Sequence, residues 1–151
     1  MAFVQAMRDG ITVIWDEYAG IRAALNGVHP QGFYSALVPL WTDSLIVYSA
    51  SPERVGKIDD SELRQLVVYM NTGLRGHLKS LRQNNALVED YEQLYRAHGP
   101  LPFPSQMERQ AETMREYTRN LQKADGELAQ LVEKFLAATE AWLRRNRVSQ
   151  E

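Results

Sequence analysis

The chain has 151 residues, of which 44% are hydrophobic and 24% charged, with a formal net charge of −2 and no cysteine. This length and composition predict one domain, residues 1–151, that can bury a hydrophobic core. The missing cysteines exclude disulfides, thiolate nucleophiles and cysteine-ligated metals. The small negative charge offers no general attraction for nucleic acid or an anionic membrane. No apolar run reaches the roughly 18 residues that a membrane-spanning helix needs.

The first predicted element is a helix over residues 2–26, ended by Asn26 and Gly27. Its apolar residues recur at intervals of four and three, which places them on one side of a helix at about 3.5 residues per turn. They are Phe3, Met7, Ile11, Ile14, Tyr18, Ile21 and Leu25. No Ser, Thr, Asp or Asn precedes Phe3 as a cap, so the helix starts like the interior of a longer one. A simple frayed start is the alternative.

The segment from Phe33 to Ala50 is apolar and rich in aromatic residues, and Pro39 divides it. We expect short helices between residues 33 and 58, packed against the long ones. The sequence Ser51-Pro52-Glu53 is typical of a helix start, because a hydroxyl caps, proline suits the first helical position and an acid follows. Gly56 keeps that helix short.

A second long helix is predicted over residues 60–96. Asp59 is followed three residues later by Glu62, which resembles a capping box. The spacing of four and three recurs here, and all of its residues except His77 and Asn84 are apolar or aromatic. They are Leu63, Val67, Met70, Leu74, His77, Leu81, Asn84, Val88, Tyr91 and Tyr95. The proline-rich stretch 97–104 ends this helix as a stiff connection and is the one hinge that the sequence predicts.

The third long helix is predicted over residues 105–147. Ser105 and Glu108 form a capping box, and an apolar residue recurs every seventh position from there on. These are Met107, Met114, Leu121, Leu128, Phe135 and Trp142. A helix of this length measures about 60 Å, whereas a compact domain of this size has a radius of gyration of about 15 Å. The fold class predicted is therefore all-α, an elongated bundle of three long helices with coiled-coil-like packing.

No constellation for metal or cofactor chemistry is evident, so neither is predicted. The three histidines are far apart in sequence, and neither a Glu-x-x-His nor a His-x-x-x-His pair is present. His77 occupies a core-spaced position, and we expect it to form a polar core layer with Asn84, two turns along. Gly73 and Gly76 match the Gly-x-x-Gly of an RNA-binding loop by letters alone. Because they lie inside an unbroken heptad pattern, we interpret them as points where another helix approaches closely.

Two sets of residues are candidates for partner binding. The first is a partner surface on the last helix, formed by adaptable or aromatic side chains: Met107, Met114, Tyr117 and Trp142. The alternative is that these residues pack on the 60–96 helix. The second is a basic stripe, Arg75, Lys79 and Arg82, spaced to share one helix face. It would contact phosphates or lipid headgroups, and a solvated face is the alternative.

Part of the chain also resembles a known group of proteins, over about residues 10–92. The similar residues include Ile46-Val47-Tyr48, the block Val55 to Arg64, Val67 to Tyr69, Gly76, Ser80 and Asn84-Asn85. They resemble uncharacterised bacterial helical proteins with a single N-terminal transmembrane helix that leads into a Trp-x-x-Tyr-like stretch, matched here by Trp15 and Tyr18. The resemblance implies a bundle on the cytoplasmic side, anchored to the inner membrane through a segment absent from this chain. A soluble relative of the group is the alternative. It implies no enzymatic activity.

The function that these patterns favour is a non-enzymatic protein–protein interaction or scaffold module, with a protein partner or self-association. A nucleic-acid or phospholipid-headgroup binder that uses the basic stripe is the first alternative. A third hypothesis is an enzyme whose pocket is lined by Tyr34, Trp41, Tyr48 and His77, because these residue types permit a pocket although no spacing demands one.

Overall fold

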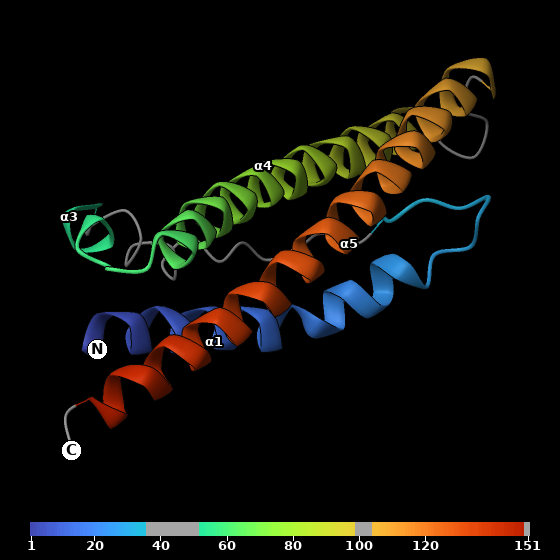
Figure 1. Cartoon of the computed structure of the whole chain (residues 1–151). Helices are drawn as coiled ribbons and strands as arrows, with labels where there is room; N and C mark the ends of the chain where they lie inside the picture. Colours follow the sequence, from blue (N-terminus) through green and yellow to red (C-terminus); the bar gives the residue numbers. More distant parts are fainter. Residues whose placement is uncertain (36–51, 99–103, 150–151) are drawn as a thin grey trace. The chain divides into compact units, whose positions relative to one another are not determined.

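The computed structural model describes residues 1–35, 52–98 and 104–149, and helices cover 88% of them without a strand. Within these ranges the helices are α1 (Ala2–Asn26), α3 (Pro52–Gly56), α4 (Ser61–His98) and α5 (Pro104–Val148), shown in Figure 1. The prediction of an all-α fold with three long helices is confirmed. Over the described ranges, no helix is both long and apolar enough to cross a membrane.

The helix ends differ from the predicted ones by a residue or two. Asp60, not Asp59, caps α4, because its Oδ1 accepts a hydrogen bond from the backbone N–H of Leu63 at 3.0 Å. Helix α5 begins at Pro104, so Ser105 lies inside the first turn and the predicted cap there is wrong. Proline suits that first position because its missing N–H is not needed there. Pro52 begins α3 as predicted.

Two predictions fall mostly outside the described residues. The first is that of helices between 33 and 51, of which only residues 33–35 are described, and these are not helical. The second is the hinge at 97–104, where α4 ends at His98 and α5 begins at Pro104.

The chain divides into two compact units, and each long helix contributes to both. The first unit comprises residues 1–19, 41–76 and 126–151, and the second comprises residues 20–40 and 77–125. Buried apolar residues of the first unit are Val4, Met7, Ile11, Ile14, Tyr18, Ile58, Leu63, Val67, Met70, Leu74, Leu128, Val132, Phe135, Trp142 and Leu143. Those of the second are Leu25, Tyr34, Leu78, Leu81, Val88, Met107, Ala111, Met114 and Leu121.

Gly73 marks a point of close helix packing in the first unit. A Cβ on this residue would lie 3.3 Å from Leu131 Cδ2 and 3.5 Å from Leu128 Cδ1, so α5 approaches α4 closely there. A Cβ on Gly76 would have no such atom within 4 Å. The close-approach interpretation is therefore correct for Gly73 and wrong for Gly76, which lies on the exposed side of the helix.

In the second unit, the connection after α1 is tied to the long helices. The backbone N–H of Tyr34 donates to Thr118 Oγ1 at 2.9 Å, and the rings of Phe33 and Tyr91 meet edge to face at 5.4 Å. The residues of the predicted heptad face of α4 are less buried at its C-terminal end, where Tyr91 is half-buried and Tyr95 is 55% exposed. The aromatic residues at that end are thus only partly used by the core.

Candidate functional site

The second unit contains a buried charged cluster built around Asp125. Its side chain is 2% exposed and accepts hydrogen bonds from Arg22 Nε at 3.0 and 3.2 Å. Asn26 Nδ2 donates to the same carboxylate at 3.0 Å and to the backbone carbonyl of Arg22 at 2.9 Å. The C-terminal turns of α1 thereby hold the α5 carboxylate from two sides, which compensates the cost of burying its charge.

The predicted polar core layer lies in the same unit. His77 is 4% exposed and Asn84 is 1% exposed. Burial lowers the pKa of His77 below its ordinary value of 6.5, while the charge of Asp125 raises that pKa and the charge of Arg22 lowers it. Asn84 Nδ2 is buried and finds no hydrogen-bond partner among the described residues. A buried polar pair of this kind sets the register of packed helices at some cost in stability.

Sequence reasoning missed the α5 side of this polar core. The seven-residue repeat found there marks only one of two buried rows. The other row lies four residues further on in each heptad, at Ala111, Thr118, Asp125, Val132 and Thr139, all of them buried. This second row contains two threonines and an aspartate, so a search for apolar residues alone does not detect it. The four-and-three spacing used for the other helices would have found it.

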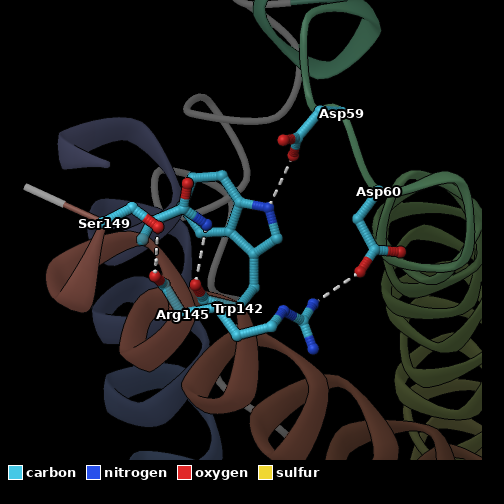
Figure 2. Close-up of a pocket in the computed structure, with 6 residues that line it drawn as sticks. Asp59, Asp60, Trp142, Arg145 and Ser149 are labelled. Atoms are coloured by element: carbon cyan, nitrogen blue, oxygen red, sulfur yellow. Dashed lines mark hydrogen bonds and ion pairs between the residues drawn. The ribbon is translucent and has the colours of Figure 1, made fainter.

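A second group of polar side chains lines a hollow of about 360 Å³ in the first unit, shown in Figure 2. Trp142 Nε1 donates to Asp59 Oδ1 at 2.9 Å, and Arg145 donates to Asp60 Oδ2 at 2.8 Å. Both α5 side chains thus point at the start of α4, where Asp60 also serves as the cap. Ser149 Oγ donates back to the Arg145 carbonyl at 2.9 Å.

These contacts join the C-terminal end of α5 to the residues that precede α4. Each carboxylate already accepts a hydrogen bond from α5, and the hydroxyl of Ser149 is engaged by its own helix. The arrangement stabilises this junction between the helices. Elsewhere, no group of three potential metal ligands was found among the residues described.

The predicted partner surface on the last helix requires correction. Met107, Met114 and Trp142 are buried, at 9%, 1% and 8% exposure, and Tyr117 is half-buried with its hydroxyl donating to the Ser80 carbonyl at 3.0 Å. These side chains are part of the cores of their own units, because the apolar row that would bind a partner packs on helices of the same chain. The alternative interpretation, packing within the chain, fits their burial.

The other predicted residues take different positions. Arg75, Lys79 and Arg82 are all exposed on α4. Of the four residues proposed to line an enzyme pocket, Tyr34 and His77 are buried in the second unit. Trp41 and Tyr48 lie outside the described residues.

The strongest interaction candidate in the first unit is the outer face of α4 near its start (Figure 1). Val68 and Tyr69 are each 53% exposed there, although both are apolar or aromatic. A hollow of about 670 Å³ lies beside them, lined among others by Val55, Gln65, Val68 and Tyr69. We call the exposed residues Glu62, Gln65, Val68, Tyr69, Thr72 and Arg75 the α4 outer face.

Comparison with known proteins adds no relative. No known protein family matches the chain, and no curated protein or solved structure is significantly similar to it. The resemblance to membrane-anchored bacterial helical proteins therefore stays a prediction.

Proposed function

We propose that this protein is a non-enzymatic interaction or scaffold module that binds a protein through the α4 outer face. The observation that supports this proposal is the pair Val68 and Tyr69, more than half exposed beside a hollow. Exposed apolar side chains that gather in one place are typical of interaction sites, and tyrosine is enriched among the residues that dominate binding energy. The resemblance adds the proposal that this surface acts on the cytoplasmic side of an inner membrane.

Site-directed photocrosslinking tests the proposal. A photoreactive phenylalanine analogue at position 69 should yield a discrete crosslinked protein, whether a second copy or another chain, when the protein is expressed in its native host. The same analogue at Val13, which is equally exposed on α1, is the matched control. Crosslinks that are absent from position 69, or equal at both positions, would contradict the proposal.

The exposure of Arg75, Lys79 and Arg82 supports a second candidate, the phosphate or lipid-headgroup binder. Its affinity for nucleic acid or anionic vesicles would fall steeply with salt, because each neutralised phosphate releases counterions. A pull-down from lysate with membranes, using the wild type and a Lys79→Glu/Arg82→Glu variant that leaves Arg75 of the α4 outer face in place, separates the candidates. Nucleic acid or lipid recovered by the wild type alone favours this second candidate, whereas a protein recovered equally by both favours the first.

A further inference from the structure

The positions of the α4 outer face are symmetric about the midpoint between Val68 and Tyr69. Gln65 precedes Val68 by three positions, and Thr72 follows Tyr69 by three. Glu62 precedes Val68 by six positions, and Arg75 follows Tyr69 by six. All six are exposed. Apart from the adjacent pair Val68 and Tyr69, neighbours in this set are three positions apart, so the set shares one side of the helix. The face therefore has an uncharged centre, an acidic end and a basic end.

Such an order suits an antiparallel pair of identical helices. A twofold axis passing between Val68 and Tyr69 would set Tyr69 beside the second copy's Tyr69, and Val68 beside the second copy's Val68. Along the centre of the face, Gln65 would lie opposite the second copy's Thr72. At each end, Glu62 would lie level with the second copy's Arg75, so opposite charges meet twice. A parallel pair would instead place like charges level with each other.

Resting on the proposed function, we propose that the partner of the α4 outer face is a second copy of this chain, paired antiparallel about that axis. Two features argue for this occupant. The charge complementarity is produced by the symmetry itself, since a twofold interface brings each residue against a different one of the same patch. The centre offers Tyr69, an aromatic side chain suited to contact at the axis of a pair, and contains no charge that pairing would bury.

The first test is the molar mass of the full chain in solution over a range of concentrations. We expect a concentration-dependent dimer. Tyr69→Arg places two cations side by side at the axis and should weaken dimerisation by about tenfold or more. At concentrations where both proteins are monomeric its thermal melt should be unchanged, because the side chain is exposed in the single chain. Val13→Arg introduces the same cation at an equally exposed site outside the face and should leave the dimer intact.

The second test addresses the pairing of the ends. Glu62→Arg alone and Arg75→Glu alone should each weaken the dimer, because each sets like charges level with one another. The double variant Glu62→Arg/Arg75→Glu should restore it, since the opposite charges are exchanged and still meet. A double variant that is weaker than both single variants would overturn the assigned register.

The third test uses disulfide trapping, which is clean because the chain has no cysteine. Gln65→Cys/Thr72→Cys should form a covalent dimer, while the two cysteines within one chain are about 10 Å apart along the helix and do not bridge. Thr72→Cys alone should form no covalent dimer in oxidising conditions. A covalent dimer from Thr72→Cys alone would indicate a parallel pair and overturn the proposal.

A monomer at every concentration would also overturn the self-pairing. If photocrosslinking at position 69 then still captured another protein, the proposed interaction function would stand with a different partner. If Tyr69→Arg lowered the melting temperature of a monomer, Tyr69 would belong to the packing of its own chain, and both proposals would fail.

Discussion

Asp125 shows how a single residue ties two helices of the second unit together. Its carboxylate is almost fully buried and is satisfied by Arg22 and Asn26 of α1. A buried carboxylate is tolerated only when it is paired and hydrogen-bonded. Because a misaligned pairing would leave this carboxylate buried without partners, Asp125 makes the pairing of α1 with α5 specific.

We predict that Asp125→Ala lowers the free energy of unfolding by about 3 kcal/mol, because it leaves Arg22 without its buried carboxylate partner. Arg22→Leu/Asp125→Leu should cost less than the sum of the two single leucine variants, since it removes both charges together. Urea unfolding of the wild type, Arg22→Leu, Asp125→Leu and the double leucine variant gives the coupling energy between the two side chains. Strictly additive losses would show that the pair contributes no mutual stabilisation.

His77 predicts a pH dependence at the same scale. Burial lowers its pKa below the ordinary 6.5, so the unfolded chain takes up the proton first as the pH falls. The stability that neutral His77 contributes to the folded state is therefore complete above pH 6.5. It is lost as the pH falls from there towards the pKa of His77 in the folded chain. The slope is at most about 1.4 kcal/mol per pH unit.

The comparison of wild type with His77→Gln at pH 7.5, 6.0 and 5.0 checks this prediction. We expect the wild type to lose more stability than the variant over this range. Asp125 and Arg22 act on His77 in opposite directions, so the Asp125→Ala background should steepen the loss. Equal slopes for wild type and His77→Gln would contradict the prediction.

At the scale of elements, the glycines report how closely the helices approach. Gly126 of α5 has open space where a Cβ would lie, whereas Gly73 of α4 faces Leu128 and Leu131. Glycine inside a helix costs about 0.5–1 kcal/mol relative to alanine. Replacing either glycine with alanine removes this cost. At Gly73 the crowding by the leucines opposes the gain in stability, whereas at Gly126 nothing lies close enough to oppose it.

We predict that Gly126→Ala raises the free energy of unfolding by about 0.5–1 kcal/mol. Gly73→Ala should gain less, or lose stability, because Leu131 must move away from a contact of 3.3 Å. Thermal and urea unfolding of the two variants measure the difference. An equal gain at both sites would mean that the leucines yield without cost.

At the scale of the whole molecule, Trp142 separates folding from assembly. It is 8% exposed, and its indole N–H is bonded to Asp59. We predict that Trp142→Ala lowers the stability of the single chain by about 3 kcal/mol or more. Trp142→Phe, which keeps a ring but loses the donor, should cost about 1 kcal/mol for the hydrogen bond together with the smaller ring volume.

Unfolding and molar mass should be measured on the same samples. A loss of stability at concentrations where the protein is monomeric identifies Trp142 as part of the core. A variant that keeps its stability but loses self-association would instead restore the original prediction of a partner surface on the last helix.

The sequence by itself determined the helical class, the three long helices and most of their buried faces. The reason is that a heptad row such as Leu63 to Val88 is a local property, set by spacing along one helix. It also identified the polar positions His77 and Asn84, since they interrupt that row.

The tertiary structure alone decided what each row packs against. Met114 and Trp142 have the chemistry of an interface and of a core alike, and only the neighbouring helices show that they are buried. The pairing of Arg22 with Asp125 joins residues far apart in the chain, which no local spacing encodes. The exposure of Val68 and Tyr69 is likewise decided by which side of α4 its neighbours cover.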